Sequence, residues 1–250
     1  METDMPRLAV LIDAENAQLA ILGSLLAEIA KFGTASVKRV YGDFTSQILA
    51  SWRDPMLAHS IQPIQQFRNT VHKNASDSAL IIDAMDLLHS KRLDGFCIVS
   101  SDSDFTRLAS RLREEGLLVY GFGERYTPVS FIAACHKFTY TEILRTPGTP
   151  PSEAAPAVRK EILNDKSEIT RHLVDAVESC TDDSGWARLA AVGIVVANHV
   201  PDFDPRHYGF KNLSALVEST GVFELQRRDG PAQPMFVRLK NPPGDQDGPR

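Results

Sequence analysis

The chain has 250 residues, of which 43% are hydrophobic and 24% are charged, and its net charge is −5. This balance is typical of a soluble globular protein and excludes a disordered chain, and no apolar run approaches the ~20 residues that span a bilayer. The N-terminus lacks the basic region of a signal peptide, and the acidic balance disfavours a nonspecific nucleic-acid binder without excluding an enzyme built on carboxylates.

Strand and helix signals alternate along the first part of the chain. Apolar runs predict strands, and apolar residues at helical spacing predict helices between them. Pro63 places the third strand at a sheet edge or weakens it. The pattern predicts an α/β fold with a mostly parallel sheet covered on both faces, in which ligands bind at the carboxyl ends of the strands. The expected strands are 8–12, 37–44, 61–67, 95–99 and 117–122, and the expected helices are 17–31, 75–90 and 105–115.

A proline-rich segment separates two expected domains. Residues 146–156 contain four prolines and no large apolar side chain, which is typical of an extended linker. The last ten residues, NPPGDQDGPR, are typical of a disordered tail. We therefore expect a first domain at 1–145, a linker at 146–159, a second domain at 160–240 and a tail at 241–250.

The second domain shows helical spacing in three stretches: 160–181, a stretch opened by Ser184-Gly185-Trp186-Ala187, and 204–220. Residues 222–225 and 235–239 then flank the polar segment RRDGPAQP, as the strands of a hairpin do. Three helices and a hairpin predict a small winged-helix domain.

Cysteine usage indicates the cellular compartment. The three cysteines, Cys97, Cys135 and Cys180, are odd in number and form no CxxC pair. We therefore expect neither a disulfide framework nor a cysteine-based zinc site, and a reducing cytoplasm fits best. All three lie among apolar residues, so we expect them to be buried small side chains.

Carboxylates follow two of the predicted strands. Asp13 ends the first strand, Asp102 and Asp104 follow the fourth, and Asp77 lies in the first turn of the helix at 75–90. Because parallel strands bring their carboxyl ends to one rim, we expect these four acids to lie close together. Clustered carboxylates persist when a cation neutralises them, and all-oxygen ligands suit Mg²⁺ or Mn²⁺. Such ions can activate a water for phosphodiester hydrolysis.

Other roles for these acids stay open. Asp102 or Ser103 can cap the following helix, and Asp77 can favour the dipole of its own helix. A phosphatase that forms an aspartyl-phosphate would want a second aspartate at position 15, where the chain has Glu15, which we interpret as a solvated or structural carboxylate. Neither a GxxxxGK phosphate loop nor a GxGxxG after the first strand is present, which disfavours a nucleotide cofactor.

The segments LAVLIDAEN, KNASDSALIIDAMD and IVSSDSDF, in this order, resemble the three signature blocks of NYN domains, which belong to the PIN-like nuclease superfamily. The resemblance covers about residues 6–145. It implies a Rossmann-like α/β/α sandwich that cleaves RNA with a divalent metal. It also implies that Asn16 holds a ligand, water or phosphate, and that the metal ligands are Asp13, Asp77, Asp102 and Asp104.

Three residues near these blocks have two interpretations each. Ser101 is either a phosphate contact or a turn residue, and Lys73 is either a phosphate contact or a solvated side chain. Asp83 matches an acidic position of the family's block, but it lies six residues after Asp77, about 120° round the helix. We therefore expect Asp83 to support the ligands rather than to reach the same ion.

The stretch from 160 to 240 resembles the OST-HTH, or LOTUS, domain. The matching features are Gly185-Trp186, the segment YGFKNLSALVEST and the closing hairpin. This resemblance implies RNA binding, or protein binding in some members. Lys211, Arg227 and Arg228 are then the candidates for phosphate contact, and the alternative is a solvated helix and hairpin tip.

These features predict a cytoplasmic ribonuclease that depends on Mg²⁺ or Mn²⁺, forms no covalent intermediate and carries a winged-helix module that recruits RNA. The alternative is a non-catalytic adaptor that docks RNA or protein. Cleavage of DNA is a third option, because the choice of RNA rests on the resemblance alone. We expect RNA as the partner, with a possible protein partner at the winged helix, no membrane and no nucleotide cofactor.

Overall fold

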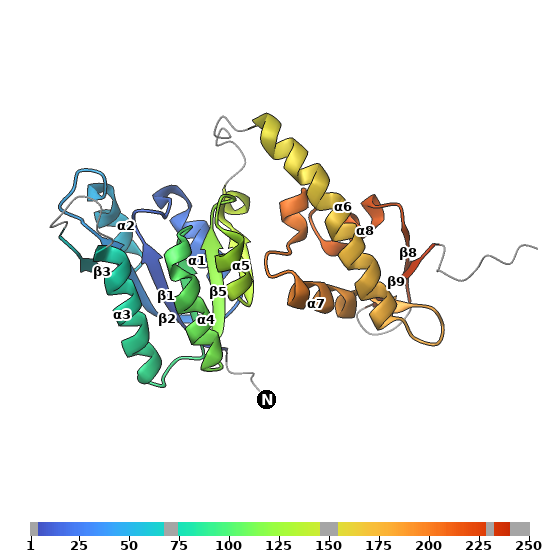
Figure 1. The fold of residues 1–250 in the computed structure, drawn as a ribbon, viewed down its shortest axis with the longest axis horizontal. Coiled ribbons are helices and arrows are strands. Elements are labelled where there is room, and N and C mark those ends of the chain that lie inside the picture. Colours follow the sequence, from blue (N-terminus) through green and yellow to red (C-terminus); the bar gives the residue numbers. More distant parts are fainter. Residues whose placement is uncertain (1–4, 68–74, 146–154, 229–232, 241–250) are drawn as a thin grey trace, which may run out of the picture. The chain divides into compact units, whose positions relative to one another are not determined.

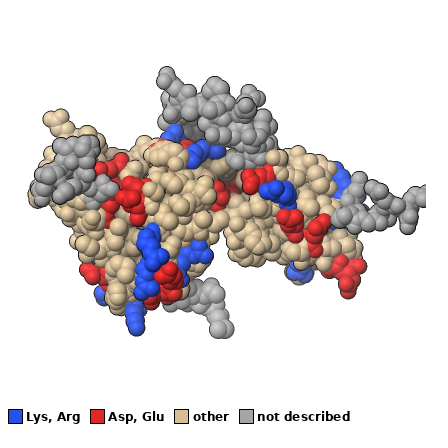
Figure 2. Space-filling view, in the orientation of Figure 1, with Lys and Arg blue, Asp and Glu red and all other residues tan. Residues whose placement is uncertain are grey.

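The computed structural model describes residues 5–67, 75–145, 155–228 and 233–240, with only the backbone described for 155–166. The chain divides into two compact units, residues 1–147 and 148–250 (Figure 1). Figure 2 shows acidic and basic side chains interspersed on the visible face of both units. Within the described ranges, no helix has the length and apolar character needed to cross a membrane.

The first unit is built on a six-stranded sheet with the strand order β3-β2-β1-β4-β5-β6. Every neighbouring pair in this sheet is parallel, which confirms the predicted α/β fold class. The strands are β1 Arg7–Asp13, β2 Thr34–Gly42, β3 Gln62–Gln65, β4 Gly95–Val99, β5 Leu118–Gly123 and β6 Lys137–Tyr140.

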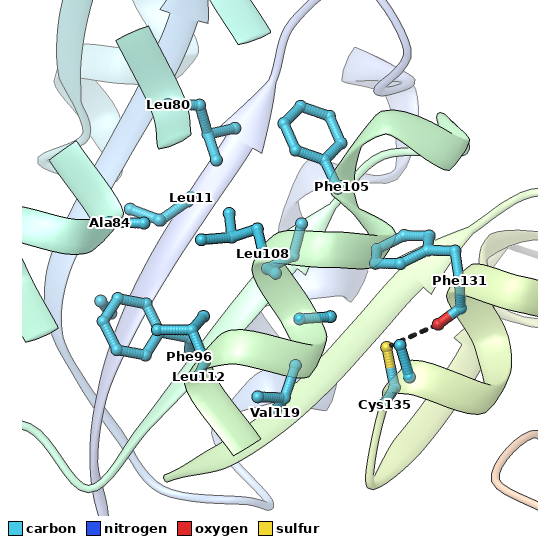
Figure 3. Packing of buried hydrophobic residues seen from close by; sticks show 14 of the residues in the cluster. Leu11, Leu80, Ala84, Phe96, Phe105, Leu108, Leu112, Val119, Phe131 and Cys135 are labelled. Atoms are coloured by element: carbon cyan, nitrogen blue, oxygen red, sulfur yellow. Dashed lines mark hydrogen bonds between the residues drawn. The ribbon is translucent and has the colours of Figure 1, made fainter. Parts of the chain in front are cut away.

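Helices cover both faces of the sheet. Along β1 the side chains alternate: Leu11 packs with α3 and α4, whereas Val10 packs with α1 on the opposite face. Figure 3 shows Leu11, Leu80 of α3 and Leu108 of α4 converging in one of these two cores. The helices are α1 Leu22–Ile29, α2 Arg53–Ala58, α3 Ala75–His89, α4 Thr106–Glu114 and α5 Val129–Ala134.

The order of the strands fixes where a ligand can bind. The chain runs from β1 outward through β2 to β3 and then returns to place β4 on the other side of β1. The neighbours β1 and β4 therefore form the switch point of the sheet, which is where ligands of open α/β folds bind. Strand β1 ends at Asp13, and the loop that leaves β4 begins at Ser100.

The first unit differs from the sequence prediction in the extent of one helix and in three elements that were not predicted. The sequence predicts one helix over 17–31, but only Leu22–Ile29 is α-helical, preceded by a 3-10 turn at Leu19–Ile21. Helices α2 and α5 and strand β6 were not predicted, because all three are short and the β6 sequence, Lys-Phe-Thr-Tyr, contains no continuous apolar run. Strand β3 is an edge strand, and its Pro63 lies there as the sequence indicates.

In its described residues the second unit has three α-helices and a three-stranded antiparallel sheet with the order β7-β9-β8, as expected for a winged helix. Its hydrophobic core joins α6, α7, α8 and the inner face of the sheet. The elements are α6 Ala155–Cys180, β7 Ala187–Arg188, α7 Leu189–His199, a 3-10 turn at Pro205–Tyr208, α8 Leu213–Ser219, β8 Phe223–Arg227 and β9 Met235–Leu239.

Three expected boundaries in this unit were wrong. The second helix begins at Leu189, because Gly185 turns the chain with φ +77° and residues 187–188 form β7. The helix expected over 204–220 is broken at Gly209, whose φ of +84° is left-handed, and it restarts as α8. Helix α6 begins at Ala155, inside the segment expected as linker, since a proline is tolerated in a first helical turn. Residues 146–154 lie outside the described part.

All three cysteines are free, as the sequence indicates. Cys97 and Cys135 are buried, and burial raises the pKa of both thiols, to about 12 for Cys135. Cys180 is only partly buried. The two buried thiols are therefore small core side chains rather than reactive groups.

Candidate active site

The end of β1 holds a buried carboxylate. Asp13 is 1% exposed, and its Oδ2 accepts hydrogen bonds from Asn16 Nδ2 at 2.7 Å and Ser100 Oγ at 2.9 Å. Its Oδ1 accepts a hydrogen bond from the backbone amide of Glu15 at 3.0 Å. Burial raises the pKa of Asp13, and these three donors oppose that rise by stabilising the charged form. Both carboxylate oxygens of Asp13 therefore have partners within the protein.

A second group of carboxylates lies beside Asp13. Asp77 comes from the first turn of α3, and Asp102 and Asp104 come from the loop and 3-10 turn that follow β4. One carboxylate oxygen from each lies within 4.8 Å of the others. We call these three residues the acidic triad. Asp77 and Asp102 are half-buried and Asp104 is exposed, so the triad opens to solvent.

The charges around Asp77 are predominantly negative. Burial, followed by the charges of Asp13 and Asp102, raises the pKa of Asp77 to about 7. Glu15 and Asp104 raise it further. Asp13 therefore acts on the triad through its charge. Within the described residues, the oxygens that lie within 4.8 Å of one another come from Asp77, Asp102 and Asp104 and not from Asp13. Of the four predicted ligands, the structure brings three together and holds the fourth beside them.

Asp102 has the capping role that the sequence left open. Its Oδ1 accepts a hydrogen bond from the backbone amide of Asp104 at 2.9 Å, which caps the 3-10 turn Ser103–Phe105. Its own amide donates to Ser100 Oγ at 3.1 Å. Because a carboxylate has two oxygens, capping leaves Asp102 able to serve the triad as well.

Ser100 is a site residue that the sequence analysis missed. It is 1% exposed, and its hydroxyl donates to Asp13 and accepts from the amide of Asp102. This single hydroxyl links the end of β1 to the loop after β4. A serine among four polar residues gives no signal for that role, because the role depends on β1 and β4 being neighbours.

Asp83 lies about one and two-thirds turns further along α3 and does not reach the triad. Its Oδ2 accepts hydrogen bonds from Arg39 Nη1 and from Tyr41 Oη, both at 2.9 Å. Tyr41 is fully buried, and burial followed by the charge of Asp83 raises the pKa of its hydroxyl. Asp83 thus ties α3 to β2 and fixes the helix that carries Asp77.

Ser101 and Lys73 are the remaining predicted phosphate contacts of the first unit. Ser101 is 5% exposed, and its hydroxyl accepts a hydrogen bond from the amide of Glu124 at 2.8 Å, so it joins the ends of β4 and β5. The Glu124 carboxylate accepts a bond from Gln18, whose own carbonyl accepts from Arg145 at 3.0 Å. Lys73 lies outside the described residues.

The predicted phosphate contacts of the second unit lie at its surface. Lys211 is exposed in the turn before α8, and Arg227 is exposed at the end of β8. Arg228 is partly buried, with its guanidinium 4.0 Å from the centre of the Phe236 ring. These three side chains thus stay candidates, and only Arg228 stacks on an aromatic ring in the described contacts.

The donor set of the triad fits a small divalent cation. Ligand oxygens around octahedral Mg²⁺, with bonds of about 2.1 Å, are separated by about 3.0 Å when adjacent and about 4.2 Å when opposite. Three carboxylate oxygens within 4.8 Å of one another approach this arrangement with small side-chain movements. Oxygen ligands without histidine or cysteine favour Mg²⁺ or Mn²⁺ over zinc.

Comparison with known proteins gives two domain matches. A family model of the NYN domain matches residues 7–144, and one of the OST-HTH/LOTUS domain matches residues 164–235. No curated protein matched.

Three solved structures are similar to parts of the chain. A protein of unknown function from Vibrio parahaemolyticus is 16% identical over 55% of this chain and 94% of its own, with a TM-score of 0.47. An uncharacterized protein from Nitrosomonas europaea is 30% identical over 39% of this chain and 86% of its own, with a TM-score of 0.27. Part of a protein from Chromobacterium violaceum is 32% identical over 33% of this chain and 85% of that structure, with a TM-score of 0.26.

Proposed function

The chain belongs to the NYN family, and from this premise we propose that it is a ribonuclease dependent on Mg²⁺ or Mn²⁺, with a C-terminal module that recruits RNA. The acidic triad is the observation that carries the proposal, because three carboxylate oxygens from α3 and the loop after β4 converge within 4.8 Å. The triad also lies at the switch point of the sheet, where this class of fold binds its ligands.

The protein's own residues would divide the work of the site. A bound divalent ion would supply an activated water and offset the charge of a substrate phosphate. Asp77, Asp102 and Asp104 would hold the ion, and Asp77 would have to release its proton to do so. Asp13 stays a candidate fourth ligand, for which an ion would compete with the three donors that now hold its carboxylate.

Other residues would position these ligands and the RNA. Asn16 holds Asp13 and would meet a water or phosphate when that bond opens. Ser101 would lend its hydroxyl to a phosphate, and Lys73 would supply a positive charge from the segment before α3. In the second unit, Lys211 and Arg227 would contact phosphates of a longer RNA. We place the protein in the cytoplasm on its cysteine usage.

A cleavage assay with Asp102→Asn tests the proposal. Asparagine caps helices as well as aspartate does, so this variant keeps the turn at 103–105 and removes only the charged ligand. The substrates are end-labelled single-stranded RNA and DNA of the same sequence, with Mn²⁺, Mg²⁺ or EDTA. The matched control is Asp86→Asn, which changes an exposed acid on α3 outside the triad.

We expect metal-dependent cleavage of RNA by the wild type and by the control, and a loss of at least about a hundredfold in Asp102→Asn. Equal cleavage by both variants would refute the site. Binding of RNA without cleavage by any of the three proteins would favour the adaptor. Equal cleavage of DNA would overturn the choice of RNA.

A further inference from the structure

The sheet of the second unit has an outer face that carries aromatic side chains. In β9, Met235, Val237 and Leu239 pack with the hydrophobic core. Phe236 points the opposite way, because successive side chains of a strand alternate between the faces. Neither Phe236 nor Trp186 belongs to the part of that core that the described residues form. The two residues are nevertheless only 7% and 9% exposed. Something other than the core must therefore cover them.

Three arginines cover these rings. The guanidinium of Arg228 lies 4.0 Å from the centre of the Phe236 ring, and that of Arg238 lies 4.5 Å from the centre of the Trp186 ring. Arg188, opposite Phe236 in the β7–β9 pair, lies 5.9 Å from the same ring. We call Trp186, Arg188, Arg228, Phe236 and Arg238 the arginine face.

Two of these three arginines have exposed side chains that a ligand can reach. Arg188 is exposed, and the Arg238 side chain keeps 44% of its surface. Glu224 Oε2 accepts hydrogen bonds from Arg238 Nε at 2.8 Å and Nη2 at 2.6 Å, so this edge of the guanidinium is paired. A guanidinium that lies over a ring can stack a nucleobase on its other face and offer a phosphate those N–H donors that no carboxylate holds, which in Arg238 are the donors outside the Nε–Nη2 edge.

We propose that the arginine face binds single-stranded RNA, with bases stacking on the guanidinium planes and phosphates meeting their edges. The inference deepens the proposed RNA-recruiting function of this unit and rests on it. A docking partner that is apolar would need exposed rings, whereas here the rings lie beneath charged planar groups. Unpaired bases fit this arrangement, because their flat faces are open for stacking and a duplex hides them.

The test measures binding by the full chain in EDTA, so that it does not depend on cleavage. Fluorescein-labelled single-stranded RNA is titrated with the wild type, Arg188→Gln, Arg238→Gln and the double variant, and anisotropy is followed at several salt concentrations. The matched control is Arg171→Gln, whose side chain is 68% exposed on α6 and pairs only loosely with Glu168 at 3.7 Å. Quenching of Trp186 gives a second readout, with Trp52 as the other tryptophan of the chain.

We expect each arginine-face variant to weaken RNA binding about five- to tenfold, the double variant to weaken it further, and the control to match the wild type. RNA should quench tryptophan fluorescence, and a duplex of the same sequence should bind more weakly. Equal affinity in all variants, or no RNA binding at all, overturns the proposal. So does equal binding of the duplex, or competition by polyglutamate at matched charge, since either would show charge attraction without stacking.

The outcomes also separate this inference from the nuclease proposal. Normal cleavage that Asp102→Asn abolishes, with RNA binding insensitive to Arg188 and Arg238, would retain the nuclease and remove the arginine face. RNA binding that these arginines control, without cleavage by the wild type, would retain the arginine face and remove the nuclease.

Discussion

Binding of a divalent ion to the acidic triad should release a proton from Asp77. The pKa of this carboxyl is raised to about 7, first by burial and then by the charges of Asp13 and Asp102. A metal ion binds the ionised form, so metal binding and proton release are linked. With a pKa of about 7, roughly 3% of Asp77 is ionised at pH 5.5 and roughly three-quarters at pH 7.5.

The linkage between metal binding and proton release sets how strongly the affinity for Mn²⁺ depends on pH. The apparent affinity for Mn²⁺ should be about 25-fold lower at pH 5.5 than at pH 7.5, from the ratio of the two ionised fractions. Isothermal titration calorimetry in two buffers with different ionisation heats counts the protons directly. It should give about one proton released per ion at pH 5.5 and about a quarter of a proton at pH 7.5.

Two variants make this measurement decisive. Asp77→Asn should bind Mn²⁺ weakly and lose most of the pH dependence, whereas Asp86→Asn, on the same helix, should retain the wild-type values. Glu15→Gln should move the midpoint to lower pH, since the charge of Glu15 raises the pKa of Asp77. An affinity that is equal at both pH values, or a dependence that persists in Asp77→Asn, would refute the role of Asp77.

Three further changes should have measurable effects on stability. Without metal, the raised pKa of Asp77 contributes stability that is present below about pH 4 and is lost as pH rises through about 7, so urea midpoints should fall across this window and recover with Mn²⁺. Asp83→Ala removes the partner of Arg39 and of the buried Tyr41 hydroxyl, and urea unfolding should show a loss of about 2–4 kcal/mol against little change in Asp86→Ala. Ser100→Ala should lower the free energy of unfolding by about 1–2 kcal/mol, measured by thermal unfolding, because it leaves the amide of Asp102 without its acceptor. The same variant should bind Mn²⁺ more weakly, and an unchanged metal affinity would contradict the linking role of Ser100.

The sequence identifies the parts of the fold that are governed by local pattern. Strands β1 and β4 are continuous apolar runs because the parallel sheet buries both of their faces. The acids that follow them could be assigned to one rim, since parallel strands share their direction. Helices α2 and α5, of six residues each, and strand β6, of four, escaped prediction because so few residues do not establish a period.

The missing site residues depend on contacts distant in sequence. Ser100 and Asp13 are 87 positions apart, and their hydrogen bond requires β4 beside β1. Arg188 and Arg238 share a face only through the pairing of β7 with β9, a register that neither segment encodes alone. The resemblance offered Arg227 and Arg228 as candidates for phosphate contact, whereas the position of the Arg228 guanidinium over the ring of Phe236 is seen only in the structure.

The difference between the surroundings of the Asp13 and Asp77 carboxyls argues for a cation at the triad. Both carboxyls are buried enough to raise their pKa, but three hydrogen-bond donors oppose the rise at Asp13. At Asp77 the largest effects are burial and four carboxylate charges, all of which raise the pKa. Capping alone does not account for this concentration of charge, since asparagine or serine would cap the turn that Asp102 caps. A divalent ion would supply the opposing charge, and so would a proton shared between the carboxylates. The number of protons released per Mn²⁺ at pH 5.5 is the measurement that distinguishes the two.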